Sequence, residues 1–156
     1  MITDTTGDIF KANTEAIVNP VNCVGVMGKG LALEFRKRFP HNFREYKWEC
    51  DNNLLHTGEM CVTGPYIESN GKLFANYPMY IINFPTKKHW RNPSKLIYID
   101  EGLITLAKTI EEYEIKSIAI PALGVGNGGL DWKDVRSMIE YRLQNSTAKI
   151  IIYNPL

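Results

Sequence analysis

The sequence predicts an α/β fold in three layers, with helices covering both faces of a central sheet. Short β-rich segments alternate with longer helical ones along the 156 residues, which is typical of strand–helix–strand units. In addition, the runs SIAIPAL and KIIIY are apolar at consecutive positions, as expected for strands buried on both faces. Chains of this length bury a full core, so we expect residues 1–156 to form a single domain.

Seven segments are predicted as strands because each is apolar or β-branched and ends at polar, Gly or Pro residues. In chain order they are Ile2–Asp4, Ala16–Asn19, Cys61–Thr63, Leu73–Asn76, Tyr80–Phe84, Ser117–Pro121 and Lys149–Tyr153.

Three helices are predicted from apolar residues that recur at spacings of three and four. The first runs from about Gly30 to Phe39, with Leu31, Phe35 and Phe39 facing inward. The second places on one face the residues Leu96, Ile99, Leu103, Leu106, Ile110 and Tyr113. The third begins after Asp131, a suitable N-cap, and its buried side carries Val135, Met138, Ile139 and Leu143.

Composition excludes several classes of protein. No apolar run approaches the roughly 18 residues needed to span a bilayer, and the N-terminus lacks a signal pattern, so we expect a cytoplasmic protein without a membrane partner. The odd number of cysteines (Cys23, Cys50 and Cys61) includes no CxxC pair and argues against a disulfide framework. The scattered histidines (His41, His56 and His89) predict neither a metal site nor a bound cofactor.

The net charge of +1 conceals a basic segment. Between Ser69 and Ile99 there is no Asp or Glu, whereas the segment contains Lys72, Lys87, Lys88, Arg91 and Lys95. Such a segment is either a solvated surface or the binding face for an anionic partner, which would be a phosphate-bearing ligand or nucleic acid.

Two glycine-rich loops each connect a predicted strand to a predicted helix. They read NCVGVMGKGLA and ALGVGNGGLDW. Glycine lets backbone N–H groups approach a ligand, and a helix N-terminus favours an anion. The second loop matches GxGxxG but has no acidic residue on the following strand, and the first lacks the hydroxyl that a P-loop needs after its lysine, so both nucleotide motifs are set aside. The loops are either plain connections or the walls of a crevice for two phosphates.

Four segments together resemble the macrodomain family: TTGDIF, AIVNPVNCVGVMGKGLA, IAIPALGVGNGGLDW and IIIYNP. The resemblance covers essentially the whole chain and implies an ADP-ribose-binding α/β/α fold with a central mixed sheet. It further implies that Asp8 and the backbone of Ile9 bind the adenine, that Tyr153 flanks it, and that the two glycine loops hold the distal ribose and the diphosphate. Without the resemblance, Asp8 is equally a turn or N-cap residue and Tyr153 a core aromatic. The loop residues implied are Asn22, Gly28, Lys29, Gly30, Leu31, Gly124, Val125, Gly126, Asn127 and Gly128.

Within this family, VGVMGKGLALEFRKRFP and NFPTKKHWRNPS are most similar to the DarG-like DNA ADP-ribosyl glycohydrolase antitoxins and their animal relative, the terminal ADP-ribose protein glycohydrolase. In that branch a lysine after the Thr of the second motif is catalytic, which corresponds to Lys87. The catalytic aspartate of the animal enzyme falls on Gly128, so a lysine–aspartate pair is not carried over. This departure favours the DNA-directed branch and makes Asp131 a structural residue.

The residues around Lys87 suit this chemistry. Lysine attacks carbon as the neutral amine, and a cationic, partly apolar neighbourhood favours that form. We therefore expect Lys87 to attack the anomeric carbon of the distal ribose, or to assist ring opening, while Asn22 orients the ribose hydroxyls. The adjoining Lys88, His89, Trp90 and Arg91 are expected to bind DNA phosphates and stack on an unpaired base. Alternatively, Lys87 is an ordinary surface lysine, and His89 and Trp90 pack at the rim.

The leading hypothesis is an enzyme that removes ADP-ribose from nucleic acid, from thymine in single-stranded DNA, and so reverses the modification made by a cognate ADP-ribosyltransferase toxin. An alternative enzyme would hydrolyse ADP-ribose esters of protein glutamate, or O-acetyl-ADP-ribose. A third possibility is a non-catalytic reader of ADP-ribose, which would share Asp8, both loops and Tyr153. Only Lys87 and its neighbours separate the enzymes from the reader.

Overall fold

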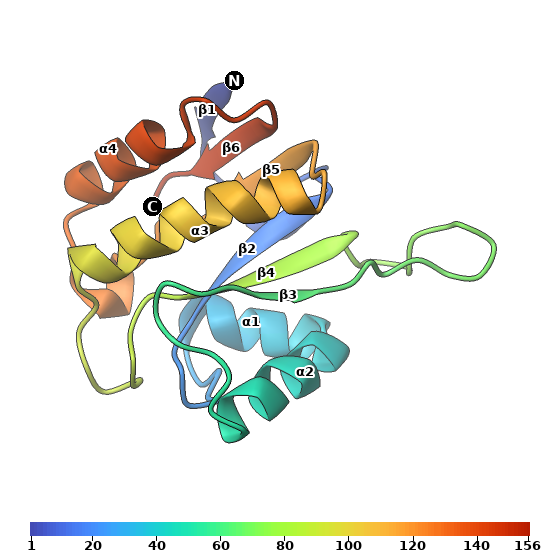
Figure 1. The fold of residues 1–156 in the computed structure, drawn as a ribbon, viewed down its shortest axis with the longest axis horizontal. Coiled ribbons are helices and arrows are strands. Elements are labelled where there is room, and N and C mark those ends of the chain that lie inside the picture. Colours follow the sequence, from blue (N-terminus) through green and yellow to red (C-terminus); the bar gives the residue numbers. More distant parts are fainter.

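A computed structural model describes all 156 residues and shows a mixed sheet between two pairs of helices (Figure 1). The sheet has the order β1-β6-β5-β2-β4-β3. Its strands are β1 (Ile2–Thr5), β2 (Ala16–Val21), β3 (Cys61–Thr63), β4 (Tyr80–Pro85), β5 (Ser117–Ile120) and β6 (Lys149–Tyr153). The helices are α1 (Gly30–Arg38), α2 (Pro40–Asp51), α3 (Leu96–Glu112) and α4 (Trp132–Leu143), with 3-10 turns η1 (Ile9–Lys11) and η2 (Gly126–Gly128).

All neighbouring strands are parallel except β3, which pairs antiparallel to β4 at the edge of the sheet. Parallel strands end at the same edge, so the loops that follow β1, β2, β4, β5 and β6 emerge together. This arrangement brings both glycine loops and the basic segment after β4 to one end of the molecule.

Each face of the sheet has its own apolar core, which confirms the three-layer prediction. On one face, α3 and α4 pack on inward residues of β2, β4, β5 and β6, with Phe84, Leu103, Leu106 and Ile139 fully buried. On the other face, α1 and α2 pack through Phe35, Phe39 and Tyr46. Figure 1 shows the two helix pairs on opposite sides of the strands.

Helix α2 was not predicted, and its inward face explains why. Its two fully buried side chains are Asn42 and Tyr46, both polar, one helical turn apart. An apolar stripe is the main sequence signal for a helix, and here hydrogen-bonding side chains occupy that stripe. Pro40 at the first helical position was the remaining signal, because proline is favoured there.

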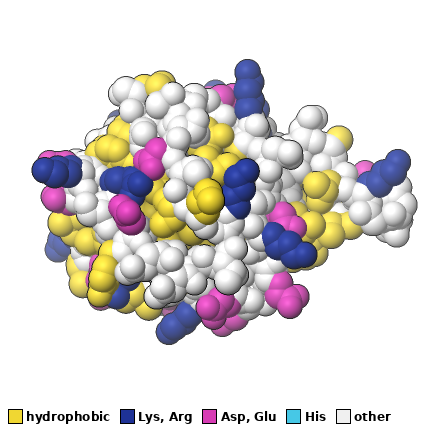
Figure 2. All heavy atoms as spheres, turned by 90° about the horizontal axis from the view of Figure 1, so that it is seen from above, with side chains coloured by type: hydrophobic (Ala, Val, Ile, Leu, Met, Phe, Trp, Pro, Cys, Tyr) yellow, Lys and Arg dark blue, Asp and Glu magenta, His cyan; other side chains and the backbone are white.

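The predicted strand Leu73–Asn76 is wrong. Leu73 makes only an isolated bridge to Ile67, and Asn76 adopts a left-handed backbone with φ of 65°, which ends any extended run. The segment belongs to a long arm, residues 64–79, that projects from the sheet between β3 and β4 (Figure 1). Figure 2 shows this arm protruding at the right and, elsewhere on that face, positive and negative side chains interspersed.

The other predicted elements are confirmed, with small differences at their ends. Strand β2 continues two residues further than predicted, to Val21, and the third helix begins directly after its N-cap Asp131, whose carboxylate accepts from the Lys133 N–H at 2.8 Å. Leu96 and Tyr113, predicted to be inward, are 36% and 41% exposed because they lie at the two ends of α3. None of the helices is long and apolar enough to cross a membrane.

Candidate functional site

The carboxyl edge of the sheet carries an open cleft of about 1350 Å³. Its walls come from the loops after β1, β2, β4 and β5 and from the chain after β6. Every residue predicted to bind ADP-ribose lines this cleft, and so do Lys87, Trp90 and Arg91. Lys88 and His89 do not line it. The fold therefore collects in one place residues that lie as far apart in the chain as Asp8 and Tyr153.

Asp8 and Tyr153 form one end of the cleft. The Asp8 carboxylate caps η1, because its Oδ1 accepts from the Phe10 N–H at 2.9 Å, so the expected capping role is present while Oδ2 has no partner within the chain. Tyr153 lines the same cleft as Asp8, and burial and the charge of Asp8 raise the pKa of the Tyr153 phenol. The Arg38 guanidinium lies 4.3 Å over the Phe10 ring on the same wall.

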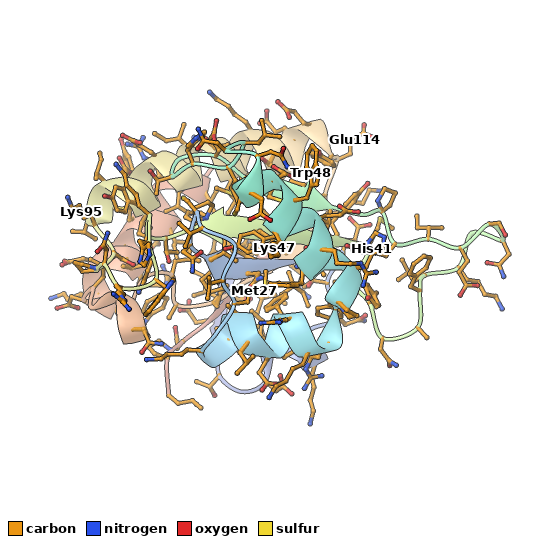
Figure 3. The ribbon with its side chains drawn as sticks, turned by 90° about the horizontal axis from the view of Figure 1, so that it is seen from below. Met27, His41, Lys47, Trp48, Lys95 and Glu114 are labelled. Carbon is orange, nitrogen blue, oxygen red and sulfur yellow. The ribbon has the colours of Figure 1, made fainter.

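The first glycine loop is held from within by Asn22. The Asn22 Nδ2 donates to the Val26 carbonyl at 2.8 Å, and its Oδ1 accepts from the N–H groups of Val24 and Val26 at 3.0 and 3.4 Å. Met27 anchors the loop, since it is fully buried in the core on the α1 side, as Figure 3 shows from below. Asn22 thus lines the cleft with most of its amide already used for shaping the loop.

The second glycine loop meets the first across the cleft. Gly124 has φ of 71°, a conformation that favours glycine. A Cβ built on Gly30 of the first loop would come within 3.8 Å of the Asn127 side-chain nitrogen. A Cβ on Gly126, in contrast, would meet no atom within 4 Å. The Gly126 backbone therefore borders open space in the cleft, where a ligand can approach it closely.

Gly128 interlocks with Ser94, a residue that the sequence did not single out. A Cβ on Gly128 would collide with the Ser94 Oγ and lie 3.0 Å from its Cβ, while the Ser94 N–H donates to the Gly128 carbonyl at 3.0 Å. The Ser94 hydroxyl is buried and has no partner. An aspartate at position 128 would therefore require the Ser94 side chain to move.

Lys87 reaches from the end of β4 to the second glycine loop. Its side chain is partly buried, and its Nζ lies 3.4 Å from the Asn127 carbonyl oxygen. Its amine thus contacts the second glycine loop within the cleft. None of the ion pairs of the chain includes Lys87, so no acidic group lies within ion-pair distance of the Lys87 amine.

The rest of the basic segment divides into two clusters. His89 and Trp90 stack with ring centroids 5.2 Å apart, and the Arg91 guanidinium lies 4.6 Å over the Trp90 ring. Lys88 points elsewhere: the Nζ atoms of Lys88 and Lys95 lie 5.7 and 5.8 Å over the ring of Tyr98.

Lys72 does not belong to either cluster, because it lies in the arm between β3 and β4. Lys95 is at the end of the molecule opposite the arm (Figure 3). The basic face predicted from the sequence therefore loses Lys72. Tyr98 joins it, because the side chains of Lys88 and Lys95 lie over its ring.

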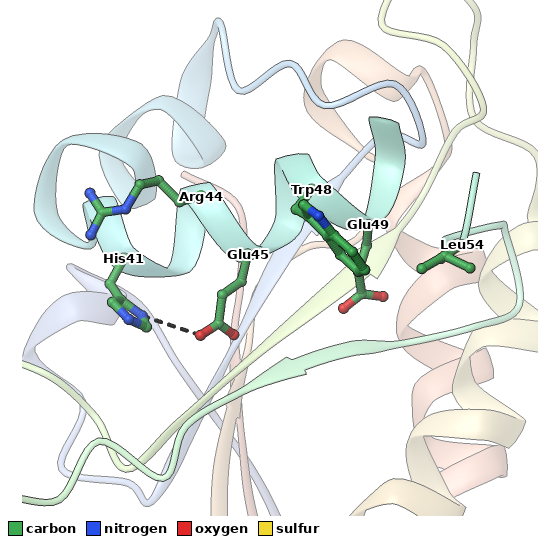
Figure 4. A pocket seen from close by; sticks show the side chains of 6 residues that line it. All are labelled: His41, Arg44, Glu45, Trp48, Glu49 and Leu54. Atoms are coloured by element: carbon green, nitrogen blue, oxygen red, sulfur yellow. Dashed lines mark ion pairs between the residues drawn. The ribbon is translucent and has the colours of Figure 1, made fainter. Parts of the chain in front are cut away.

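A second hollow, of about 470 Å³, lies beside α2 and holds none of the predicted site residues. It is lined by His41, Arg44, Glu45, Trp48, Glu49 and Leu54. Its one internal ion pair joins His41 Nδ1 and Glu45 Oε1 at 3.3 Å (Figure 4). No group of three or more His, Cys, Asp or Glu side chains is arranged to hold a metal ion in the chain.

Comparison with known proteins agrees with this geometry. The Macro domain model matches residues 18–139. A DNA ADP-ribosyl glycohydrolase of Mycobacterium tuberculosis is 50% identical over 99% of this chain. A solved structure, the macrodomain of M. tuberculosis DarG, superposes with a TM-score of 0.92 at 49% identity, covering 100% of this chain and 99% of that one.

A second similar protein comes from Thermosipho africanus. A fusion of a DNA ADP-ribosyl transferase with a DNA ADP-ribosyl glycohydrolase from Thermosipho africanus is 32% identical over 96% of this chain. T. africanus DarTG, solved in complex with ADP-ribose, has a TM-score of 0.89 at 32% identity and covers 99% of this chain. This chain spans 42% of the length of the M. tuberculosis relative, 41% of the fusion protein and 42% of the chain in the ADP-ribose complex.

Proposed function

Because the chain belongs to the Macro domain family, we propose that its cleft binds ADP-ribose and that it is an ADP-ribosyl glycohydrolase acting on ADP-ribosylated single-stranded DNA. The observation that carries the proposal is the position of Lys87, whose amine lies 3.4 Å from the Asn127 carbonyl and within the cleft. A reader of ADP-ribose needs the binding walls but has no use for a nucleophile at this point.

The proposed reaction uses Lys87 as the nucleophile. The neutral amine forms a bond to the anomeric carbon of the distal ribose, while the bond from that carbon to the thymine nitrogen breaks and the base takes up a proton. Water then attacks the same carbon, releases free ADP-ribose and restores the lysine amine. Atoms balance with one water consumed for each base restored.

The substrate class follows from charge and from position 128. The cations Lys88, Arg91 and Lys95 have no acidic partner, and Trp90 is 45% exposed, which suits phosphates and an unpaired base. Position 128 is a glycine packed against Ser94, so the chain lacks the acidic residue that the resemblance assigns to this position in the animal protein-directed enzyme, and this supports a DNA substrate. We further propose that a DNA ADP-ribosyltransferase makes the substrate, since the T. africanus relative unites the two activities in its name.

A side-by-side assay tests the proposed function. The protein is incubated with an ADP-ribosylated oligonucleotide and with a glutamate-ADP-ribosylated protein, and released ADP-ribose is measured by chromatography. Release from DNA alone is expected. Release from protein alone would replace this function by the esterase alternative, and tight binding of ADP-ribose without release from either substrate would leave a reader.

Replacing Asp8 by alanine is expected to weaken ADP-ribose binding by about 1.5–3 kcal/mol, the range for a hydrogen bond to a charged group. The free Oδ2 of Asp8 would otherwise accept from the adenine amino group. Titration calorimetry measures the loss, with a chelator present in a parallel run because binding is expected to need no metal. Asp8→Asn is the matched control, since it keeps the cap on the Phe10 N–H. Equal affinity of Asp8→Ala and parent would place the adenine elsewhere.

Activity on long DNA is expected to fall with salt, and Lys88→Ala with Lys95→Ala should reduce that dependence. Each lost phosphate contact lowers the slope of log affinity against log salt by about 0.7 for a single strand. KM for a long oligonucleotide should rise while kcat stays near the parent value. Lys149→Ala is the control, because Lys149 is the first residue of β6 and so lies at the amino end of the parallel strands, away from the cleft. A salt slope equal in parent and double variant would remove this surface from the DNA path.

A further inference from the structure

The buried tyrosine Tyr46 of α2 touches the first glycine loop at its most constrained residue. Its hydroxyl lies 2.8 Å from the Asn22 backbone carbonyl and 2.8 Å from the Asn22 side-chain Oδ1. The Tyr46 side chain is completely buried, so neither water nor ligand contacts it. Burial raises the pKa of this phenol, which keeps it a hydrogen donor.

Helix α2 is held in register against the sheet one turn before Tyr46. The amides of Asn42 and Asn83 exchange two hydrogen bonds, at 2.8 and 3.2 Å, and Asn42 also accepts from the Thr63 hydroxyl at 2.7 Å. Asn19 of β2 donates to the same Asn83 at 3.0 Å. These side chains are fully or almost fully buried. Apart from the Asn19 Oδ1, which has no partner, the amides of this network are hydrogen-bonded, and their bonds hold the helix in the arrangement that sets where Tyr46 places its hydroxyl.

Tyr46 and the loop together fix which way the Asn22 amide faces, since the one phenol hydrogen is shared between the Asn22 carbonyl and Oδ1 while two backbone N–H groups also point to Oδ1. With Oδ1 accepting from Tyr46, Val24 and Val26, the nitrogen must lie on the other side, where it donates one hydrogen to the Val26 carbonyl. An amide nitrogen carries two hydrogens, so one remains on a residue that lines the cleft.

We propose that Tyr46 is a positioning residue for the glycohydrolase reaction: by holding the Asn22 amide and the loop of residues 22–28, it sets the distal ribose in line with Lys87. The proposal rests on the proposed function. Tyr46 touches no substrate, so its effect passes through Asn22. Misplacement of reacting groups by about 1 Å costs up to about a hundredfold in rate, and the adenine and diphosphate are proposed to bind at other segments, around Asp8 and Gly126.

A double-mutant cycle tests the proposal with an ADP-ribosylated oligonucleotide as substrate. Tyr46→Phe, which keeps the ring in the core, should lower kcat about tenfold or more and leave KM within about twofold. Asn22→Ala should lower kcat at least as much. In the Asn22→Ala background, Tyr46→Phe should cause a much smaller fall in kcat, because only the bond of Tyr46 to the backbone carbonyl of residue 22 is left to lose. Multiplying effects, or an unchanged kcat in Tyr46→Phe, would overturn the proposal.

Matched variants separate positioning from stability. Tyr66→Phe removes another buried tyrosine hydroxyl that has no partner, so its kcat should equal that of the parent. Replacing Tyr46 by 4-aminophenylalanine restores a donor and should rescue kcat. The 4-aminophenylalanine variant also tests the proposal if Tyr46→Phe does not fold. A folded 4-aminophenylalanine variant whose kcat is as low as that of Asn22→Ala would contradict the proposal.

Amide exchange provides a readout that does not depend on activity. With ADP-ribose bound, the Val24 and Val26 amides should exchange faster in Tyr46→Phe than in the parent, since their acceptor Asn22 Oδ1 is released. Equal exchange rates of these amides in Tyr46→Phe and the parent would contradict the positioning role. A parent that binds ADP-ribose but releases it from no substrate would sink the proposed glycohydrolase function instead, whatever the exchange result.

Discussion

Replacement of Lys87 by alanine is expected to abolish turnover, lowering kcat by roughly 10³-fold or more, while the affinity for ADP-ribose changes by less than about threefold. A nucleophile acts mainly in the transition state, so its removal costs rate and leaves ground-state binding intact. The fold of the binding loops should survive the change, because the Lys87 amine makes a single hydrogen bond within the chain, to a backbone carbonyl. Single-turnover release of ADP-ribose from an oligonucleotide measures the rate, and calorimetry measures the affinity.

Two neighbouring variants sharpen this result. Lys87→Arg should be as inactive as alanine, because a guanidinium stays charged and is not a nucleophile. Lys88→Ala removes an adjacent cation that points to Tyr98 and not into the cleft, so it should affect KM for long DNA and spare kcat. Parental turnover in Lys87→Ala would refute the mechanism, and restored turnover in Lys87→Arg would show that charge, not nucleophilicity, is what position 87 supplies.

Gly126→Glu is expected to abolish ADP-ribose binding, with Kd raised by more than about a hundredfold. The new Cβ meets no protein atom within 4 Å, so the fold should tolerate it and the carboxylate should enter the cleft. There it would occupy space beside the diphosphate, and it would add a like charge to two phosphates that the loop is proposed to hold.

Charge and volume can be separated at the same position. Gly126→Gln has nearly the volume of glutamate without its charge, and Gly126→Ala adds only the Cβ. Affinity should fall in the order Ala, Gln, Glu, while thermal unfolding of all three stays close to that of the parent. Retained affinity in the glutamate variant would mean that this loop is only a connection between β5 and α4.

The sequence predicted the parts of the fold that have a periodic signal. The spacing of Ile99, Leu103, Leu106 and Ile110 predicted α3, and all four residues are buried in the structure. The apolar run of β6 predicted a strand covered on both faces. The residues predicted to bind ADP-ribose line one cleft; the glycine loops were visible as sequence motifs, whereas Asp8 and Tyr153 were named through the family resemblance. Their roles toward ADP-ribose remain predictions.

What the sequence missed depends on contacts between residues far apart in the chain. Tyr46 looked like any tyrosine, because its bond to Asn22 spans 24 positions and exists only when α2 packs on the sheet. Ser94 carried no signal, since its meaning comes from the absence of a side chain at Gly128. The amide of Asn22 was expected to face the ribose alone, whereas four of its hydrogen bonds serve its own loop and α2.

The interlock of Ser94 and Gly128 limits how this protein can evolve. An aspartate at position 128 would have to displace the Ser94 hydroxyl, and a smaller residue at position 94 would make room for it. The residue that one position accepts therefore depends on the residue at the other. Positions 94 and 128 are expected to vary together among relatives, so that an acidic residue at 128 is accompanied by a change at 94.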